Sequence, residues 1–498
     1  MNISMFLQMA AEACPDRNAL TSHGVHYTYA DLWNRAQTAA RLIRESGRHY
    51  VAVLDTSSPA VPVAMMGAAL AGVPYVPLNY RLARQQLDAL VARIQPAYLV
   101  VDDANMEAYG SLPESDLLSR DAFLDATAAS SEPLEDPAAD PTAIAVQLFT
   151  SGTTGTPKAA ILRHEHLVSY ILGSVEFMGA GEEEATLVTV PPYHIAGISA
   201  VMSSIYGCRR IVQLPDFAAA QWLELAEHER ITNAFVVPTM LSRIIDHLDT
   251  VERKPEIHTL RAIAYGGGKM PVPVIERALE LFPDAAFTNA YGLTETSSTI
   301  TLLGPDDHRE ALASDDPGVR ARLGSVGQPL PSVDLQIRDE EGRALEPGNA
   351  GEIYVRGPQV SGEYLERTAL VDDGWFPTRD AGYVDEAGYL FLSGRADDVI
   401  VRGGENISPA EIEDVLLPHP GVVDAAAIGV PSQEWGETVA VYVVRKNEDA
   451  INAHEIQHLI KTNLRSSRVP EHVIFEEELP YNETGKLLRR VLREQFQG

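Results

Sequence analysis

The sequence predicts an α/β protein with largely parallel sheets, followed by a smaller α+β unit. Short apolar segments alternate with segments of helical periodicity, which is typical of parallel sheets covered by helices. The apolar segments are residues 50–55, 97–103, 186–190, 210–214, 233–238 and 262–267, and the clearest helical ones are residues 29–46 and 219–231. The chain has 498 residues, 45% of them hydrophobic. This length exceeds one ordinary domain, so we expect two or three domains.

One uncharged segment, residues 56–80, is long enough to span a bilayer. Prolines and glycines divide it into short pieces; they are Pro59, Pro62, Gly67, Gly72, Pro74 and Pro77. We therefore expect a buried helix over residues 60–72 and a short strand over residues 74–78, and no membrane span.

The pattern changes after Gly324. Residues 333–357 contain short alternating strands joined by the turns DEEG and EPGN, which predicts a small β-rich subdomain. About a hundred residues at the end of the chain have strands and helices of their own and predict a small C-terminal α+β domain. Its first helix should start after Ser408 as N-cap, with Pro409 as first residue and Glu411 completing a capping box.

The composition excludes several partners. Asp and Glu number 70 and Lys and Arg number 39, so the formal net charge is −31. Such a surface repels phosphate backbones, so we expect no nucleic-acid partner and no anionic membrane partner. A local basic pocket for one small anion stays compatible with this charge.

Only two cysteines occur, Cys14 and Cys208, without metal-type spacing. A disulfide framework or zinc site therefore has no support. The first residues lack the basic start and long apolar core of a secretory signal. Both observations favour the cytoplasm.

The segment LFTSGTTGTPKAA, residues 148–160, follows an apolar run and combines glycines, hydroxyls and one lysine. Glycines let backbone N–H groups approach an anion, hydroxyls add donors, and Lys158 adds positive charge. The segment is not a Walker loop, because Pro157 precedes the lysine and no Ser or Thr follows it. It predicts a phosphate-binding loop, and alone it would fit an ordinary surface loop equally well.

Further motifs strengthen this prediction. YGGGKM, residues 265–270, is a second glycine turn after an apolar strand, and NAYGLTETSS, residues 289–298, offers an aromatic ring, hydroxyls and a carboxylate. The second set could stack a base, hold a phosphate and bind Mg²⁺, which prefers oxygen ligands. Asp380 is a candidate ribose acceptor, and Arg395 and Lys486 are candidate cationic contacts; taken singly, each also fits an ordinary packing or surface role.

These motifs, in this order, resemble those of the adenylate-forming superfamily, which includes acyl-CoA synthetases, peptide-synthetase adenylation domains and luciferases. The resemblance covers essentially the whole chain. It implies an ATP- and acyl-binding domain over residues 1–396, hinged to a mobile domain over residues 397–498 that carries the catalytic lysine. It implies ATP, Mg²⁺ and the co-substrate CoA as ligands and a small-molecule carboxylic acid as substrate. It leaves a homodimer open, and the sequence locates no interface for one.

The resemblance also implies roles for individual residues. Glu295 matches the Mg²⁺ ligand, Thr294 a phosphate contact, and Lys486 the lysine that reaches the carboxylate and α-phosphate. The residues that match the nucleotide-binding motifs are Thr150, Ser151, Gly152, Thr153, Thr154, Gly155, Lys158, Gly266, Gly267, Gly268, Asn289, Ala290, Tyr291, Gly292, Asp380 and Arg395. Among these, Tyr291 matches the ring that stacks on adenine, and Asp380 and Arg395 match the pair that binds ribose.

Four further residues match the second half-reaction and the domain motion. His194 matches a residue that borders the acyl site, although a buried structural histidine is the alternative. Gly403 and Gly404 match the part of the small domain that lines the pantetheine tunnel. Asp397 matches the hinge.

The sequence departs from the family pattern at several positions. Arg379 stands where glycine is frequent, Ala159 where glycine follows the loop lysine, and Arg402 where lysine is frequent; RSSRVP, residues 465–470, replaces a segment that usually contains Tyr and Lys. None of these departures removes a catalytic group.

The function implied is ATP-dependent activation of a fatty or aryl acid to an acyl-AMP, followed by transfer to the thiol of CoA. The alternatives are an adenylate-forming enzyme that loads a carrier protein and a diazotase that activates nitrite. A non-catalytic nucleotide-binding regulator is less favoured, because Glu295, Asp380, Arg395 and Lys486 are all present.

Overall fold

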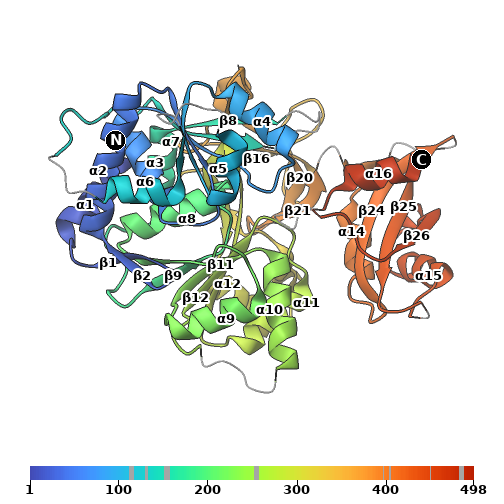
Figure 1. Ribbon diagram of the computed structural model, residues 1–498. Helices are drawn as coiled ribbons and strands as arrows, with labels where there is room; N and C mark the ends of the chain where they lie inside the picture. Colours follow the sequence, from blue (N-terminus) through green and yellow to red (C-terminus); the bar gives the residue numbers. More distant parts are fainter. Residues whose placement is uncertain are drawn as a thin grey trace.

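The computed structural model describes residues 1–110, 117–128, 133–150, 157–251, 257–395, 398–402, 405–433, 435–448, 450–481 and 487–497. Within these ranges the strands form four sheets, three in a large N-terminal domain and one in a small C-terminal domain (Figure 1). The predicted α/β class and two-domain architecture are thus confirmed.

The largest sheet is parallel in its centre. Its strands, in spatial order, are β15 (Gln328–Pro329), β14 (Ser298–Leu303), β13 (Ala286–Leu293), β12 (Ala262–Gly266), β11 (Asn233–Val236), β9 (Ala185–Val188), β10 (Arg210–Gln213), β1 (Asn18–Ser22) and β2 (Val25–Thr28). β1, β10, β9, β11, β12 and β13 pair in parallel, and the outer pairs are antiparallel. One face packs on α9 (Ala219–His228), α10 (Pro238–Thr250) and α11 (Val272–Leu281).

The second sheet belongs to the same domain. Its strands, in spatial order, are β19 (Arg367–Thr368), β18 (Glu363–Tyr364), β8 (Lys158–Arg163), β7 (Ile144–Thr150), β4 (Tyr75–Pro77), β3 (Tyr50–Leu54), β5 (Ala97–Val101) and β6 (Leu117–Ser119). α4 (Arg84–Arg93) and α5 (Asp103–Tyr109) cover one face, and α6 (Arg120–Thr127) packs on α2 (Tyr29–Ser46).

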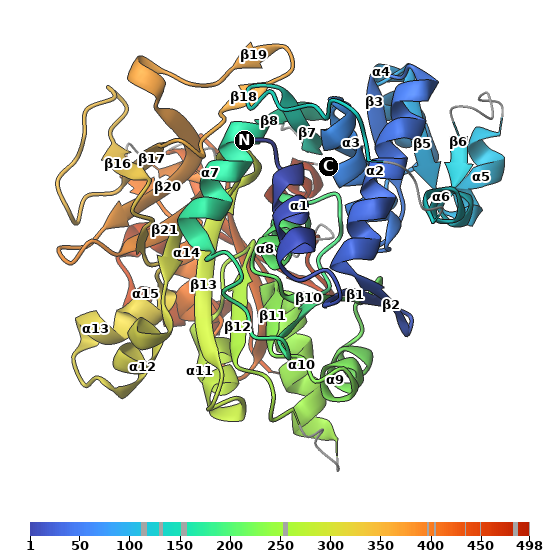
Figure 2. The same cartoon turned by 90° about the vertical axis from the view of Figure 1, so that its left-hand side faces the viewer.

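A layer of helices lies between these two sheets and makes one continuous apolar core. Its members are α1 (Ser4–Ala13), α2, α3 (Ala60–Ala71), α7 (His164–Ser174) and α8 (Ile195–Tyr206) (Figure 2). Helix α3 is buried almost throughout, as its uncharged sequence requires. Among the described residues, no helix is long and apolar enough to cross a membrane.

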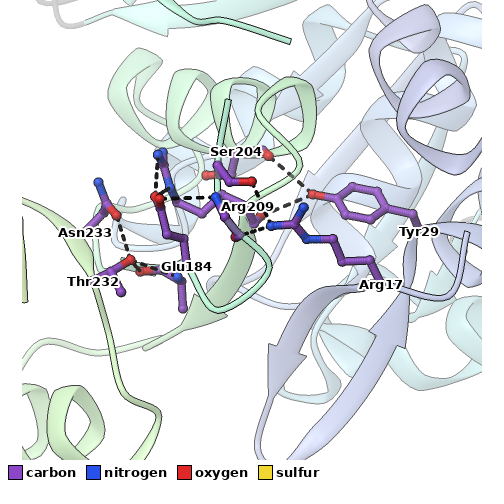
Figure 3. Close-up of polar contacts among 10 residues, drawn as sticks. Arg17, Tyr29, Glu184, Ser204, Arg209, Thr232 and Asn233 are labelled. Carbon is purple, nitrogen blue, oxygen red and sulfur yellow. Dashed lines mark hydrogen bonds and ion pairs between the residues drawn. The ribbon is translucent and has the colours of Figure 1, made fainter. Parts of the chain in front are cut away.

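Polar contacts join the start of the chain to the largest sheet. The phenol of Tyr29, the first residue of α2, donates to the carbonyls of Ser204 and Arg209 at 3.3 and 3.2 Å. Arg209 in turn pairs with Glu184 at 3.0 Å, and Arg17 donates to the carbonyl of Ala180 at 3.0 Å (Figure 3). These contacts fix the N-terminal segment against the end of α8 and the connections that lead into β9 and β10.

The β-rich subdomain expected after Gly324 is present. Its antiparallel strands are β16 (Asp334–Arg338), β17 (Gly351–Arg356), β20 (Phe376–Val384) and β21 (Leu390–Arg395). They enclose a small core that includes Ile337, Ile353 and Leu390. α12 (Pro305–Ala313), α13 (Pro317–Ala321) and the short helical turns η1 (Thr294–Thr296) and η2 (Arg322–Gly324) precede this subdomain. A further turn, η3 (Asp372–Gly374), comes just before β20.

The C-terminal domain is a separate α+β unit (Figure 1). Its strands are β22 (Ile400–Arg402), β23 (Glu405–Ile407), β24 (Val422–Ser432), β25 (Gly436–Arg445) and β26 (His472–Glu476). α14 (Pro409–Leu416) and α15 (Ala453–Asn463) pack on one face of this sheet and α16 (Arg489–Gln497) on the other, and the turn η5 spans Ser466–Arg468. The domain therefore has its own core on both sides of the sheet.

The predicted capping box of α14 is wrong. The helix begins at Pro409 as expected, but the Ser408 side chain makes no cap hydrogen bond. Its hydroxyl donates instead to the carbonyl of Ser393 on β21 at 2.6 Å, and Glu411 accepts from Arg468 at 2.9 Å. Long-range partners thus replace the local cap, because a hydroxyl and a carboxylate satisfy either kind of contact equally well.

Candidate active site

Three predicted nucleotide-binding residues meet where β13, β20 and β21 come together. The phenol of Tyr291 donates to Asp380 Oδ2 at 2.7 Å, and Arg395 Nη1 donates to Asp380 Oδ1 at 2.8 Å. Asp380 and Arg395 are direct cross-strand partners, so strand pairing holds the ion pair in register. Burial, and then Asp380, raises the pKa of Tyr291, which keeps its phenol protonated as a donor. Tyr291, Asp380 and Arg395 are called the Asp380 network below.

The backbone before Asp380 explains one departure from the family pattern. Arg379 has φ +63°, in the left-handed region that glycine adopts without cost. Its side chain is 60% exposed and lies 3.8 Å from Glu352. A glycine-type conformation is thus retained although the residue is arginine, and the Asp380 network is unaffected.

Glu295 lies in the turn η1, next to Thr294, and is 9% exposed. Its backbone carbonyl accepts from the N–H groups of Ser361 and Gly362 at 2.9 and 3.1 Å. Its carboxylate Oε1 accepts from the phenol of Tyr364 at 2.6 Å. Both the main chain and the side chain of Glu295 are therefore held by the segment that forms β18.

The Glu295 site fits a hard cation whose remaining ligands are phosphate and water oxygens and not further protein side chains. In the part of the chain that is described, no group of three or more His, Cys, Asp or Glu could hold a metal ion by itself. Mg²⁺ beside a nucleotide is usually bound by one or two carboxylates together with phosphate and water oxygens. With Oε1 bonded to Tyr364, Oε2 of Glu295 is the atom that suits this role.

The predicted phosphate loop begins and ends on paired strands. Thr150 ends β7 and Lys158 begins β8, and the two are cross-strand partners. Ser151, Gly152, Thr153, Thr154 and Gly155 lie outside the described residues. Arg93 Nη1 donates to the carbonyl of Pro157 at 2.7 Å and braces the end of the loop.

The glycines of the second and third motifs are required by backbone packing. A Cβ on Gly266 would lie 2.1 Å from the carbonyl oxygen of Ala290, and one on Gly292 would lie 1.7 Å from that of Ser298. Gly267 has φ +82°, and Gly268, next to it, is exposed. Gly266 thus lets β12 approach β13, and Gly292 lets β13 approach β14.

Asn289 is buried, and its side-chain amide donates to the carbonyl of Ser325 at 3.0 Å. This contact ties β13 to the start of the β-rich subdomain. Ala290 and Gly292 flank Tyr291 on the same strand. The motif therefore positions the strand as well as the aromatic ring.

His194 lies at the N-terminal end of α8, and its ring packs on Tyr193 with centroids 4.5 Å apart. Burial, and then the positive charge of Arg81, lowers the pKa of His194 to about 4, so the imidazole is neutral at ordinary pH. Nε2 is buried without a hydrogen-bond partner among the described residues. No described contact joins His194 to the Asp380 network.

Among the described residues, polar contacts between the small domain and the large one include the hydrogen bond from Ser408 to Ser393 and an ion pair. Lys269, one residue beyond the glycine turn, pairs with Asp414 on α14 at 2.6 Å. Lys486, Gly403, Gly404 and Asp397 lie outside the described residues.

Within the small domain, Arg402 donates to the carbonyl of Ser467 at 2.7 Å and pairs with Glu471 at 2.6 Å. These contacts use two nitrogens of the guanidinium group, so a lysine could not reproduce them.

Sequence reasoning missed the residues that support the site. They are Tyr364, Arg93 and the ion pair between Arg163 and Glu363, with N–O distances of 2.7 and 2.9 Å. No motif marks them, because each contacts a residue that is far away in the sequence. The hydrogen bond to Glu295, for example, spans 69 residues.

Comparison with known proteins agrees with this geometry. The model of the AMP-binding enzyme family matches residues 7–365, and that of the AMP-binding enzyme C-terminal domain matches residues 411–486. The chain belongs to the AMP-binding enzyme family. The first match covers the Thr150–Lys158 loop, Tyr291, Glu295 and Tyr364, and the second ends at Lys486.

Named relatives of this AMP-binding enzyme act on fatty and aryl acids. A fatty acid–[acyl-carrier-protein] ligase, ScoC, of Streptomyces coeruleorubidus is 32% identical over 97% of this chain and 94% of that protein. A feruloyl-CoA synthase of Amycolatopsis sp is 32% identical over 98% of this chain and 97% of that protein.

A solved structure with the same fold contains the expected ligands. It is the o-succinylbenzoate coenzyme A synthetase of Bacillus subtilis in complex with ATP and magnesium ion, with a TM-score of 0.84 and 29% identity over 99% of each chain. The same enzyme was also solved with its acyl-adenylate intermediate.

Proposed function

We propose that this AMP-binding enzyme activates a fatty or aryl carboxylic acid with Mg-ATP and transfers the acyl group to the thiol of CoA. The observation that carries the proposal is the Asp380 network: residues from separate motifs meet at one point of the large domain. The kinship to fatty-acid and aryl-acid ligases supports the substrate class.

In this proposal the Asp380 network binds the adenosine of ATP. An ionised carboxylate offers about four acceptor positions. Tyr291 and Arg395 use one on each oxygen of Asp380, so two remain for the ribose hydroxyls. The ring of Tyr291 supplies the face on which adenine stacks, and the strand ends at Gly266, Gly267 and Gly268 leave space beside it.

The phosphates are assigned to the loop between β7 and β8. Thr150, the segment 151–155 and Lys158 donate to the β- and γ-phosphates, and Thr294 contacts the α-phosphate region. Glu295 holds Mg²⁺ together with phosphate oxygens; when bound, the ion neutralises the charge that develops on the pyrophosphate.

The first half-reaction forms the acyl-AMP. An oxygen of the substrate carboxylate attacks the α-phosphorus, and the bond from that phosphorus to pyrophosphate breaks. Lys486 donates to the carboxylate and to the α-phosphate oxygens, and so stabilises charge in the transition state without changing its own protonation.

In the second half-reaction the CoA sulfur attacks the acyl carbon, and the bond from that carbon to AMP breaks. We assign the acyl side of the site to His194, whose neutral imidazole suits an apolar wall. Gly403 and Gly404 line the pantetheine path after the domain over residues 397–498 rotates about Asp397. Rotation removes Lys486 and so separates the two half-reactions.

The remaining proposals concern the cellular compartment, the oligomeric state and the domain boundary. Cys14 and Cys208 are free thiols, which agrees with the cytoplasm as the compartment. A homodimer stays a prediction. Asp397 as the domain boundary also stays a prediction, because residues 396–397 lie outside the described ranges.

The test is a product analysis by mass spectrometry. Enzyme is incubated with Mg-ATP and a pool of fatty, aryl and cinnamyl-type acids, with CoA, with a phosphopantetheinylated carrier protein, or with neither. The proposal expects a CoA-dependent acyl-CoA together with AMP. An acylated carrier protein without acyl-CoA would change the acceptor to that of ScoC. Absence of AMP with every acid would refute the proposed activity.

A further inference from the structure

A short edge strand joins the two halves of the proposed phosphate site. β18 pairs antiparallel with β8, with Glu363 opposite Ile161 and Tyr364 opposite Ala160. The ion pair from Arg163 to Glu363 locks this register, and the N–H of Leu365 donates to the carbonyl of Ala159 at 2.9 Å. Tyr364 is therefore held opposite Ala160, two residues after Lys158.

Tyr364 contacts a charged residue on each side. Its phenol donates to Glu295 Oε1 at 2.6 Å, and the Lys158 ammonium lies 5.9 Å from the centroid of its ring. Arg367 lies over the same ring at 5.8 Å.

The same segment also holds the main chain of Glu295. The N–H groups of Ser361 and Gly362 donate to its carbonyl oxygen, and the Ser361 hydroxyl donates to the carbonyl of Ile161. With its backbone held in this way, the hydrogen bond from Tyr364 decides which oxygen Glu295 presents. Tyr364 takes Oε1 and so leaves Oε2 for the cation.

We propose that Tyr364 is a positioning residue for magnesium binding, which orients the Glu295 carboxylate and keeps it in register with Lys158. This inference rests on the proposed function only in taking Glu295 as the metal ligand. Tyr364 touches neither the acid nor the α-phosphorus in this scheme; it acts through Glu295.

The test is direct metal binding in Tyr364→Phe, which removes the hydroxyl and keeps the ring over which Lys158 lies. Mn²⁺ binding to the full chain is measured by electron paramagnetic resonance in the presence of a non-hydrolysable ATP analogue. The expected result is binding weakened about 10-fold, as for loss of a residue that orients a metal ligand. Binding of the analogue without metal should be unchanged.

Tyr389→Phe is a matched control. The phenol of Tyr389 donates to Asp307 Oδ1 at 2.6 Å, and Arg322 lies 4.4 Å from its ring centroid, so the same kind of contact is lost outside the proposed site. Urea unfolding of both variants separates folding from metal binding. Mn²⁺ binding by Tyr364→Phe that equals wild type, or that is weakened no more than in Tyr389→Phe, would overturn the inference.

A double-mutant cycle with Glu295→Gln separates an effect through Glu295 from an effect of Tyr364 elsewhere. If Tyr364 acts through Glu295, Tyr364→Phe should have little further effect on Mn²⁺ binding in the Glu295→Gln background. An equal effect in both backgrounds would overturn the inference. If Glu295→Gln alone leaves Mn²⁺ binding unchanged, the assignment of Glu295 in the proposed function fails instead.

Discussion

The Asp380 network and the ion pair between the two domains differ in burial and in how the backbone holds them. In the network, Asp380 and Arg395 are 14% and 29% exposed and are held by strand pairing within one domain. Between the domains, the described ion pair joins Lys269 and Asp414, whose side chains are 41% and 58% exposed. Exposed pairs contribute little, whereas partly buried ones with fixed geometry contribute more. The Asp380 network is therefore held more firmly than the ion pair between the domains.

The largest effect is expected from Lys486→Ala, because the proposed function assigns to Lys486 the stabilisation of charge during adenylation. Adenylation, measured by pyrophosphate exchange, should fall by roughly 10²-fold or more, because one preorganised donor to the developing charge is lost. Thioester formation from a supplied acyl-AMP should suffer less. Lys461→Ala, at an exposed position on α15, is the control and should retain both activities. Equal loss of activity in both half-reactions would contradict the proposed rotation of the small domain between them.

Acid should weaken the large domain through His164. This residue is 2% exposed, and burial, together with the positive N-terminus, lowers its pKa to about 4 from 6.5, although Asp140 acts in the opposite direction. Between these values the unfolded chain binds a proton and the folded chain does not. Stability is therefore complete above pH 6.5 and decreases as pH falls toward 4, by up to about 3 kcal/mol.

Urea unfolding at about pH 7 and about pH 5 measures this loss. His164→Asn is the control, because asparagine offers an oxygen in place of Nδ1, which accepts from the N–H of Ile3, and does not titrate. Its unfolding free energy should depend less on pH over this range. An unchanged dependence would contradict the assignment to His164.

Asp380→Ala tests how much the Asp380 network contributes to the free energy of unfolding. It leaves the phenol of Tyr291 and the guanidinium of Arg395 without their acceptor, so stability should fall by about 1–3 kcal/mol. ATP affinity, measured by calorimetry, should fall as well. Asp334→Ala, which breaks an exposed pair with Arg356 in the same sheet, should change stability by less than about 1 kcal/mol. Equal losses would remove the distinction between the two regions.

Arg379→Gly tests the strained residue beside the network. Glycine adopts the φ of +63° without steric cost, so stability should rise by about 1 kcal/mol. The ion pair to Glu352 that is lost is long, 3.8 Å, and its arginine end is exposed, so it contributes little. Arg379→Ala removes the same side chain but keeps Cβ, so it should show no gain. A gain in both variants would assign the effect to the side chain and not to the backbone.

The smallest effect is expected at the domain contact. Lys269→Met removes an exposed pair that contributes about 0.2–1 kcal/mol, so the ratio of the two half-reaction rates should change by less than about 10-fold. The double variant Lys269→Asp with Asp414→Lys should restore the wild-type ratio. A larger change, or one that the charge exchange does not restore, would show that this contact does more than hold one domain arrangement.

The sequence alone determined the elements and the order of the motifs. The alternation of short apolar strands with helices predicts β3, β5, β9, β10, β11 and β12 close to their observed bounds, because periodicity and turn residues are encoded within a few neighbouring positions. Proline and glycine positions likewise separated α3 from β4. The motif resemblance identified the family that the comparisons confirm.

The tertiary structure decided which side chains meet. Tyr291 reaches Asp380 across 89 residues, Tyr364 reaches Glu295 across 69, and Ser408 bonds Ser393 in place of its own helix. Each of these hydroxyl groups could instead donate to a nearby backbone carbonyl or to water. The neighbouring residues in the sequence therefore do not determine which acceptor it bonds. The choice depends on strand pairing, as at Tyr364 opposite Ala160, and on which surfaces the apolar cores bring together. The partner of each side chain therefore depends on residues along the whole chain, and it can be identified only in the folded structure.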